Sequence, residues 1–511
     1  MALSSCSPAS LPYPVIPGVE FTSLAAHPVQ NASWGLIQGA GSHRNHGDTN
    51  ADGLSFCNVT LTHTHPGLND STTTQVWLPL LPQWNGRLQA LGGGGWQAGL
   101  GPEEDATMAA AVAQGYVTVM TDGSLPGVGE PKDWALLAPG VVDVQRLINF
   151  ASRSLADGAL ASKALAHSFY GRAVEKSYWS GCSTGGRQGY AFAQRYPDIF
   201  DGIAAAAPAI NWHKFFFAVL SVQVKMNAAG EFTRPCELNA LTRAAIAACD
   251  GLDGLEDGVV SAPDECTFDP YSLVGTNVEG CEVPISELAA ETAERAWKGF
   301  KSQEGELLWP TVGYEANLTT PSGTASTICP PDGGACEGFM RPLLTDWPTY
   351  FIAKNASFDW RSLSEAEFEK MFRVGKASFE AAIMATDNTD LKLFKERGGK
   401  LLTYHGLADQ IIPYGGTRNY YNAVTEVDPD VQSFYRLFEA PGLSHCAGGP
   451  GGYPAETFQA LVKWVEEGVA PDSLLAANPQ TNQSRILCAY PKKAKFVGEG
   501  PKYDAGDFVC E

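Results

Sequence analysis

The stretch YWSGCSTGGRQGY, residues 178–190, decides the predicted fold. It places Ser183 between Gly181 and Gly185 in a Gly-x-Ser-x-Gly pattern, with Cys182 directly before the serine. The residues before this pattern have the composition of a strand, and those after it have that of a helix. A serine on a sharp strand–turn–helix connection points its hydroxyl away from the sheet. The stretch therefore predicts an exposed nucleophile; a capping serine in a tight turn is the structural alternative.

Strand-like and helix-like segments alternate on both sides of this turn. They occupy residues 74–96, 105–123, 141–151, 200–210 and 398–413. The strand of the turn itself is expected to end near Trp179, and the helix to begin at Gly186. Such alternation is typical of an α/β protein with a mostly parallel sheet.

The 511-residue chain is long for one hydrophobic core. Residues 211–397 lose the alternation and contain Pro-rich turns, local cysteines and helical stretches. We therefore predict a sheet domain formed by residues 1–210 and 398–511, with an inserted domain at residues 211–397.

The net charge of −21 and the pI of about 4.8 argue against nucleic acid and anionic membranes as partners. Binding to phosphates needs clustered Lys and Arg side chains. No apolar run reaches the roughly 18 residues that a membrane span requires.

The twelve cysteines and six Asn-x-Ser/Thr sequons indicate an oxidising, secretory route. The sequons begin at Asn31, Asn58, Asn69, Asn317, Asn355 and Asn482. The N-terminus lacks the apolar region of a signal peptide, so we interpret Met1 as an added start after removal of that peptide. A cytosolic protein with many free thiols is the alternative.

Two further residues follow Ser183 in the order expected of a hydrolase triad. Asp409 lies in YHGLADQIIP and His445 in GLSHCAGG, each directly after a predicted strand. The order Ser, Asp, His is that of α/β-hydrolases. An imidazole activates the serine, and the carboxylate fixes the imidazole tautomer. We interpret His405 as a packed histidine or a neighbour of the triad.

The candidate nucleophile and the candidate base each have a cysteine neighbour. A Cys182–Cys446 disulfide would hold the two Cα atoms roughly 5.5 Å apart and would tether Ser183 to His445. Small misplacements of a catalytic group are costly, so such a link would help alignment. Two unrelated buried thiols are the alternative.

The motifs GCSTGGRQG, YHGLADQIIP and GLSHC together resemble the tannase and feruloyl esterase family of fungal secreted esterases. The resemblance implies an α/β-hydrolase fold with an inserted lid domain and a Cys-Ser, Asp, His-Cys triad whose cysteines are bridged. It also implies a serine esterase that cleaves esters of aromatic acids, either free or attached to plant cell-wall polysaccharide or tannin. Feruloyl esterase is the first expectation and tannase the second, because the motifs are shared. A hydrolase of a terephthalate monoester also belongs to this family, and an inactive hydrolase-fold binding protein is the non-enzyme alternative.

The remaining cysteines are expected to pair locally. The expected pairs are Cys6–Cys57, Cys236–Cys281, Cys249–Cys266, Cys329–Cys336 and Cys488–Cys510.

The acidic stretch CDGLDGLEDGVV, residues 249–260, suggests a calcium loop, because calcium prefers hard oxygen ligands. A solvated acidic turn is the alternative. The resemblance favours a structural Ca²⁺ in the lid. By position, its ligands would be the side chains of Asp250, Asp253 and Asp257 and the carbonyl groups of Leu255 and Val259.

The glycine run LGGGGWQAG, residues 91–99, lacks the features of a phosphate loop. In a hydrolase, a glycine loop after an early strand donates one N–H to the oxyanion, and the residue after the nucleophile donates the other. We expect these donors to be Gly94 and Thr184.

Overall fold

A computed structural model describes residues 5–101, 105–127, 129–500 and 502–511, so Met1 lies outside the described residues. Its centre is a nine-stranded sheet in the order β1-β4-β5-β7-β6-β10-β11-β16-β17. The strands are β1 (Glu20–Ala32), β4 (Leu54–Thr64), β5 (Thr72–Pro79), β6 (Arg87–Leu91), β7 (Val117–Thr121), β10 (Lys176–Cys182), β11 (Gly202–Ala206), β16 (Lys400–Gly406) and β17 (Tyr435–Ala440).

Neighbouring strands from β7 through β17 run parallel. The strands β1, β4 and β5 extend the sheet as an antiparallel border that meets β7 through β5. The predicted α/β class with a mostly parallel sheet is confirmed. The sequence analysis did not assign β1 and β4, because strands at an antiparallel border lack the alternation with helices that marks the parallel ones.

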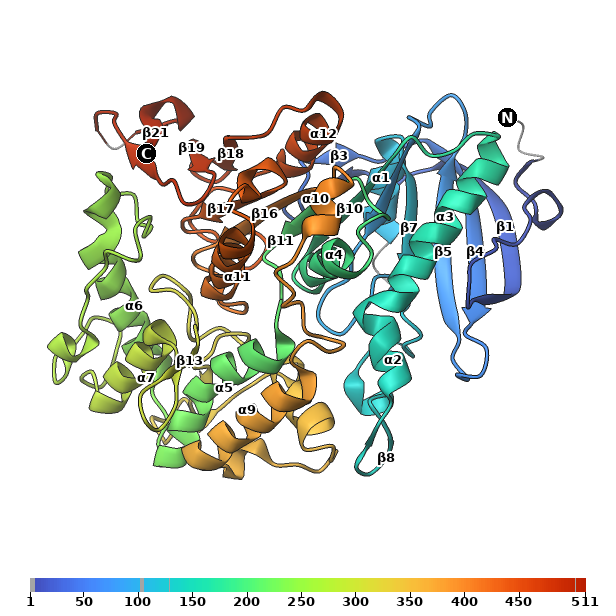
Figure 1. The fold of residues 1–511 in the computed structure, drawn as a ribbon. Helices are drawn as coiled ribbons and strands as arrows, with labels where there is room; N and C mark the ends of the chain where they lie inside the picture. Colours follow the sequence, from blue (N-terminus) through green and yellow to red (C-terminus); the bar gives the residue numbers. More distant parts are fainter. Residues whose placement is uncertain (1–4, 102–104, 128, 501) are drawn as a thin grey trace.

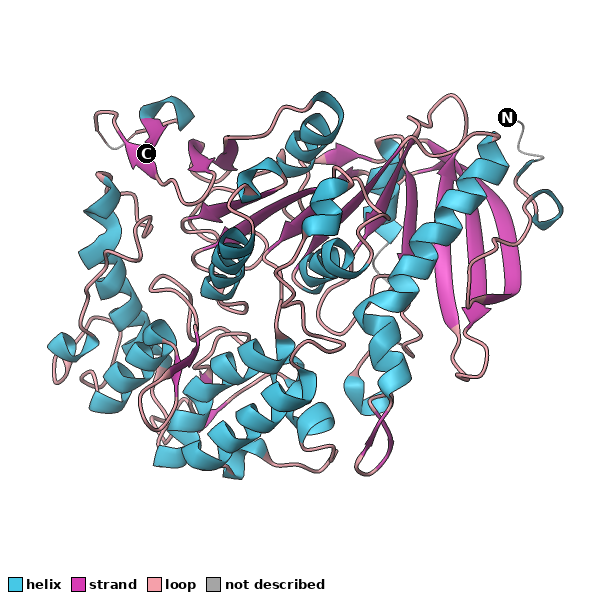
Figure 2. Cartoon of the chain, viewed as in Figure 1, coloured by secondary structure: helices cyan, strands magenta, loops and turns pink. Residues whose placement is uncertain are grey.

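Helices cover both faces of the sheet, as Figure 2 shows. The helices α3 (Ser154–Tyr170), α4 (Thr184–Arg195) and α11 (Tyr414–Val427) contribute to one core cluster with the strands. The helices α1 (Asp105–Ala113) and α12 (Thr457–Glu467) contribute to a second cluster. The short helix α2 (Val144–Ile148) precedes α3. None of the described helices is long and apolar enough to cross a bilayer.

The chain leaves the sheet after β11 and returns at β16. Most of the intervening residues form a separate, mostly helical layer, coloured green to orange in Figure 1. Its helices are α5 (Trp212–Ala229), α6 (Pro235–Cys249), α7 (Glu287–Lys298), α8 (Pro342–Asp346) and α9 (Glu365–Phe379). We call this layer the lid. None of its described strands joins the central sheet. The short helix α10 (Lys392–Glu396) follows the lid and lies on the central sheet, where Phe394 joins the core cluster of α3, α4 and α11.

Short two-stranded sheets decorate both parts. They are β2 (Leu36–Ile37) with β3 (Thr49–Asn50), β8 (Leu136–Ala138) with β9 (Val141–Val142), β12 (Phe300–Lys301) with β13 (Leu307–Trp309), β14 (Thr327–Ile328) with β15 (Glu337–Gly338), β18 (Ser473–Asn478) with β19 (Gln483–Cys488), and β20 (Ala494–Phe496) with β21 (Phe508–Cys510).

The turn at the nucleophile is tighter than predicted. The strand β10 continues to Cys182 and α4 begins at Thr184, so a single residue, Ser183, separates them. The expected end near Trp179 and start at Gly186 were wrong, because we treated the glycines as breaks in regular structure. They instead allow the strand and the helix to approach each other closely.

Candidate active site

The backbone at Ser183 has φ 63° and ψ −120°, outside the regions that side chains favour. The flanking glycines make this geometry possible. A Cβ atom on Gly181 would lie 2.6 Å from the carbonyl carbon of Gly185, closer than atoms can pack. A Cβ atom on Gly186 would lie 2.3 Å from the carbonyl oxygen of Ala206. The sequence therefore places the serine at the one point where β10 turns directly into α4.

The glycine-rich loop after β6 is hydrogen-bonded to this turn. The N–H of Gly185 donates to the Gly93 carbonyl at 2.8 Å. The hydroxyl of Thr184 donates to the Gly95 carbonyl at 2.7 Å. These two bonds hold the loop beside the start of α4, where the N–H of Thr184 lies.

Within this loop, two amides already have partners. The Gly92 N–H donates to the Ser180 carbonyl at 3.0 Å, and the Gly93 N–H donates to Gln188 Oε1 at 3.1 Å. Gly94 follows them, and a Cβ atom at this position would meet no described atom within 4 Å. Gly94 also lines a hollow of about 300 Å³ beside Ser183. These observations favour Gly94 over its two predecessors as a donor to a bound group.

The predicted base and acid contact each other. His445 Nδ1 lies 2.8 Å from Asp409 Oδ2. The Asp409 side chain is fully buried, whereas that of His445 remains 15% exposed. The other carboxylate oxygen accepts hydrogen bonds from the N–H groups of Ile411 and Ile412. His405 Nε2 approaches the same carboxylate at 3.2 Å, so this histidine is a buried neighbour of the pair.

These contacts determine the charge of Asp409. Burial alone would raise the pKa of this carboxyl group, but the charge of His445 and hydrogen bonds from His405 and His445 hold the pKa well below its usual range. Asp409 is therefore an anion at neutral pH. Because the anionic Asp409 accepts a hydrogen bond from Nδ1 of His445, Nε2 is the ring nitrogen that can accept a proton.

Another histidine, His43, lines the hollow beside Ser183. Its side chain is fully buried and makes no ion pair among the described residues. Burial lowers the pKa of His43 to about 3. A histidine that stays neutral without an orienting carboxylate is a poor general base, so His445 remains the better candidate.

The disulfide Cys182–Cys446 connects the two sides of the site, with a Cα–Cα distance of 6.0 Å. Ser183 and His445 are the residues directly next to these cysteines, although 264 positions separate the cysteines in sequence. The five local pairs also form as predicted: Cys6–Cys57, Cys236–Cys281, Cys249–Cys266, Cys329–Cys336 and Cys488–Cys510. The nucleophile turn and the base loop are thus joined covalently.

A lid carboxylate, Glu315, holds the base loop from the other side. Its two oxygens accept hydrogen bonds of 2.8 Å from the N–H groups of Gly442 and Val260. Gly442 lies three residues before His445, and Val260 ends the predicted calcium loop. Sequence reasoning missed this residue, because a glutamate in a loop gives no signal of its distant partners.

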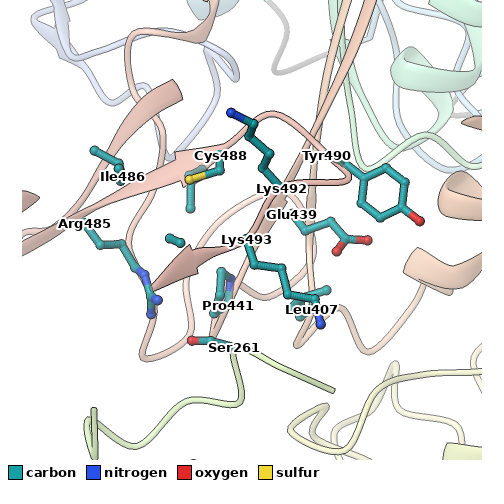
Figure 3. A pocket seen from close by; sticks show the side chains of 12 residues that line it. Ser261, Leu407, Glu439, Pro441, Arg485, Ile486, Cys488, Tyr490, Lys492 and Lys493 are labelled. Atoms are coloured by element: carbon teal, nitrogen blue, oxygen red, sulfur yellow. The ribbon is translucent and has the colours of Figure 1, made fainter. Parts of the chain in front are cut away.

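The seam between the lid and the base loop contains a small pocket, shown in Figure 3. Ser261 of the lid, Pro441 after β17 and Arg485 of β19 line it. Its volume is about 30 Å³, enough for a water molecule and far below the size of ligand pockets. The seam therefore serves packing rather than substrate binding.

In the predicted calcium loop, the side-chain oxygens of Asp250, Asp253 and Asp257 do not all lie within 4.8 Å of one another. Asp250 accepts two N–H groups of its own loop, from Asp257 and Gly258. The guanidinium group of Arg485 lies 3.1 Å from Asp253 Oδ2 and 3.6 Å from Asp257 Oδ2. Asp257 Oδ1 is buried and has no hydrogen-bond partner. An oxygen-only donor set with an unpartnered buried oxygen fits a hard divalent cation, although Arg485 supplies positive charge to two of the same carboxylates.

Comparison with known proteins identifies the family. The model of the family described as tannase and feruloyl esterase matches residues 57–511. The chain belongs to the tannase and feruloyl esterase family. A probable feruloyl esterase of Arthroderma benhamiae is 39% identical over 470 residues, which cover 89% of this chain and 86% of the relative.

Solved structures of related enzymes have the same fold as this esterase. Tannin acyl hydrolase from Aspergillus niger superimposes with a TM-score of 0.86 at 25% identity, covering 98% of this chain and 93% of that one. Feruloyl esterase B from Aspergillus oryzae superimposes with a TM-score of 0.80 at 26% identity and full coverage of both chains. Members of the tannase and feruloyl esterase family are carboxylic ester hydrolases, and the α/β-hydrolase fold predicted from the sequence is confirmed.

A cleft of about 760 Å³ lies between the glycine-rich loop of this esterase and its lid. Gly94 lines both this cleft and the hollow beside Ser183. The aromatic side chains of the cleft come from both parts: Trp96, Tyr350, Phe358 and Trp360. Its volume lies within the range of small-molecule pockets. The sequence could not have located this cleft, because its lid residues carry no motif.

Charged groups lie at one part of the cleft. Asp346, Glu130 and Lys132 all line it. Burial, together with the charge of Glu130, raises the pKa of Asp346 to about 7. The Asp346 carboxyl group can therefore donate a hydrogen bond below neutral pH as well as accept one.

Proposed function

We propose that this esterase cleaves esters of aromatic hydroxycinnamic acids through an acyl-enzyme on Ser183. One observation carries the proposal: the Cys182–Cys446 bridge brings the Ser183 turn to the loop of His445, whose Nδ1 contacts the buried Asp409. A serine hydroxyl is a weak nucleophile until an adjacent base removes its proton. The bridge, the elbow and the histidine–carboxylate pair together supply that activation.

The mechanism has two halves. In the first, His445 Nε2 takes the proton of Ser183 Oγ as this oxygen attacks the ester carbonyl carbon, and the N–H groups of Thr184 and Gly94 donate to the resulting oxyanion. When the tetrahedral intermediate collapses, the imidazolium gives its proton to the departing alcohol. In the second half, His445 deprotonates a water molecule that attacks the acyl carbon, and the acid leaves as Ser183 regains its proton. Asp409 stays ionised throughout and holds the imidazolium.

The aromatic cleft beside Gly94 supports an aromatic acid as one part of the substrate. Indole and phenyl rings offer flat apolar faces against which a phenolic ring can stack. Asp346 offers a polar group for a ring hydroxyl. Substrates can be free esters or esters attached to plant cell-wall polysaccharide.

A galloyl ester, as found in tannins, is the second candidate substrate. Two observations favour it: the TM-score of 0.86 with tannin acyl hydrolase from Aspergillus niger, and the charged side chains that line the cleft. A galloyl ring carries three adjacent hydroxyl groups and would use more of these polar partners than a feruloyl ring. Side-by-side measurement of kcat/KM on methyl ferulate and methyl gallate tests this choice. We expect the higher value on methyl ferulate; preference for methyl gallate would overturn the first candidate, and inactivity on both would overturn an aromatic acyl group altogether.

We also propose that the acidic lid loop binds a structural Ca²⁺. Asp250, Asp253 and Asp257 would supply side-chain oxygens, and Leu255 and Val259 would supply carbonyl oxygens. The ion would neutralise these carboxylates and fix the loop that ends at Val260, which Glu315 connects to the base loop. Chelation should lower Tm, and added calcium should restore it. Elemental analysis that finds no calcium in protein purified without chelator would reject the site.

We also propose that the protein is secreted and glycosylated, because it has twelve cysteines and six Asn-x-Ser/Thr sequons. The six disulfides suit an oxidising compartment. The side chains of Asn31, Asn69, Asn317, Asn355 and Asn482 are exposed, whereas that of Asn58 is half-buried. Mass spectrometry of protein from a secreting host, before and after glycosidase treatment, should find glycans at the exposed sites. Glycan-free protein from such a host would contradict the proposal.

A further inference from the structure

A second histidine–carboxylate cluster lies at the antiparallel border of the sheet. His63 is at the end of β4, His65 follows it, and Asp157 is on α3. One candidate ligand atom from each residue lies within 4.8 Å of the others. All three residues are buried: His63 and His65 are 1% exposed and Asp157 is 8% exposed. Four strand spacings separate β4 from β10 in the sheet, so the cluster lies on the order of 19 Å from the nucleophile strand.

A fourth residue, Asp70, fixes the orientation of His65. His65 Nδ1 lies 2.5 Å from Asp70 Oδ2. The same carboxylate accepts the backbone N–H of His65, the Thr64 hydroxyl and the Asn149 side-chain amide. A carboxylate with so many donors acts as an acceptor toward His65 Nδ1, which therefore carries the proton. In metal sites, a ligating histidine commonly donates its other ring N–H to a carboxylate in this way.

This orientation creates an electrostatic conflict. With the proton on Nδ1, His65 Nε2 presents a lone pair, yet it lies 2.9 Å from Asp157 Oδ2, which is also an acceptor. Two acceptors at hydrogen-bond distance need a proton or a metal ion between them. A second proton on His65 would relieve this contact alone.

The surroundings of His63 favour a metal ion over a second proton on His65. Both of its ring nitrogens are buried and have no hydrogen-bond partner in the described structure. A buried polar atom without a partner costs about 1–3 kcal/mol. A proton on His65 leaves these nitrogens unsatisfied, whereas a cation shared by the cluster gives one of them a bond.

We propose that His63, His65 and Asp157 bind a divalent transition-metal ion of the zinc class, with Asp70 orienting His65. Two imidazole nitrogens and one carboxylate oxygen suit zinc, whereas the acidic lid loop offers oxygen ligands only. The positive charge of the Arg153 guanidinium group favours a lower pKa of both His63 and Asp157. Its charge is opposed by the two carboxylates of the site, Asp70 and Asp157. The bound ion would fasten the border strand β4 to α3.

Zinc titration of the whole protein tests the inference. Protein stripped of metal by chelation is first resupplied with excess calcium, so that the acidic lid loop does not contribute, and Zn²⁺ is then added. We expect binding of one equivalent by calorimetry and a rise in Tm, because an ion that binds only the folded state stabilises it. Cobalt substitution should give the visible absorption of a nitrogen- and oxygen-ligated ion.

Variants locate the binding. His63→Phe should lower zinc affinity at least 100-fold and abolish the Tm shift, because it removes one of three ligands. His43→Phe is the matched control, since His43 is also a buried histidine with unpartnered ring nitrogens but lies outside the cluster; it should bind zinc like the wild type. Asp70→Asn should weaken zinc binding about 10- to 100-fold, the usual effect of losing a carboxylate that orients a ligating histidine. Absence of zinc binding by the wild type, or full binding by His63→Phe, would overturn the inference in favour of a protonated His65 held between two aspartates.

Discussion

Two buried groups in this molecule combine histidine with aspartate and reach different chemical states. At Asp409–His445, one carboxylate binds one ring nitrogen, and the histidine remains 15% exposed. At the β4 border, carboxylates face both ring nitrogens of His65, which is 1% exposed. A base needs a free nitrogen that a substrate can reach, so only His445 can exchange protons with a bound ester. The number of carboxylates around an imidazole and its exposure therefore determine whether the imidazole acts as a base or holds the fold.

The largest expected effect comes from removing the nucleophile that His445 serves. Ser183→Ala should lower kcat by roughly 10⁵-fold or more on methyl ferulate, because no other group on the described elbow can form the acyl-enzyme. Its Tm and its zinc affinity should match those of the wild type, because neither depends on the hydroxyl group. Near-normal turnover by this variant would remove the proposed mechanism.

The next effect separates the two histidine groups directly. Asp409→Asn should lower kcat by about 10⁴-fold, because an amide no longer fixes the productive tautomer of His445 or stabilises its positive charge. Asp70→Asn is the matched change at the β4 border and should leave kcat close to that of the wild type. Steady-state kinetics of both purified variants provides the comparison. An equal loss of kcat in the two variants would show that the border cluster takes part in catalysis.

A smaller effect should follow from loss of the covalent link beside His445. The double change Cys182→Ala with Cys446→Ala should reduce kcat about 10- to 100-fold and change KM less, because alignment of His445 on Ser183 is lost. Cys6→Ala with Cys57→Ala is the control, since it removes a disulfide at β4, on the antiparallel border of the sheet and away from the base loop. Equal kcat values for the two double variants would contradict a positioning role for the Cys182–Cys446 bond.

The smallest expected effect concerns a carboxylate without a histidine. The pKa of Asp346 is raised from 3.8 to about 7 by burial and by the charge of Glu130, so the folded state keeps a proton that the unfolded chain has already released. This group therefore contributes stability below pH 3.8 that is lost as the pH rises to about 7.

Asp346→Asn should remove that pH dependence. The Tm of the variant should rise relative to the wild type between pH 4 and pH 7. Asp409→Asn should show no such rise between pH 4 and pH 7, because the pKa of Asp409 is lowered and its stabilising contribution is lost only below the usual pKa of 3.8. Thermal unfolding of the three proteins across this pH range measures the difference; parallel curves for the two variants would contradict the assignment of their charges.

The sequence was most informative where a local pattern has one structural meaning. Gly181, Ser183 and Gly185 predicted the elbow, because only glycine fits where β10 and α4 nearly touch. The chain order of Ser183, Asp409 and His445 predicted the triad candidates, and in the structure the Asp409 carboxylate contacts Nδ1 of His445. The strands of the parallel sheet were predicted because each precedes or follows a helix of characteristic periodicity.

Residues whose roles depend on distant partners could not be found in this way. Glu315 looks like any loop glutamate until the fold brings it to Gly442 and Val260. The sequence His63-Thr64-His65 is compatible with an ordinary strand end, and only the packing of α3 against the sheet brings Asp157 to it. The aromatic lining of the cleft comes from two segments, around Trp96 and Trp360, that share no local pattern.

The sequence by itself determined the class of fold and the candidate nucleophile, acid and base, because backbone sterics and the spacing of strands, helices and glycines are local properties. The family followed from the resemblance of three motifs. Only the tertiary structure decided what surrounds each of those groups. Burial, the number of carboxylates around an imidazole and the hydrogen bonds that hold a loop arise between residues hundreds of positions apart. These surroundings set the charge of Asp409, the state of His65 and the shape of the cleft, because electrostatic free energies depend on distance and solvent exposure in three dimensions.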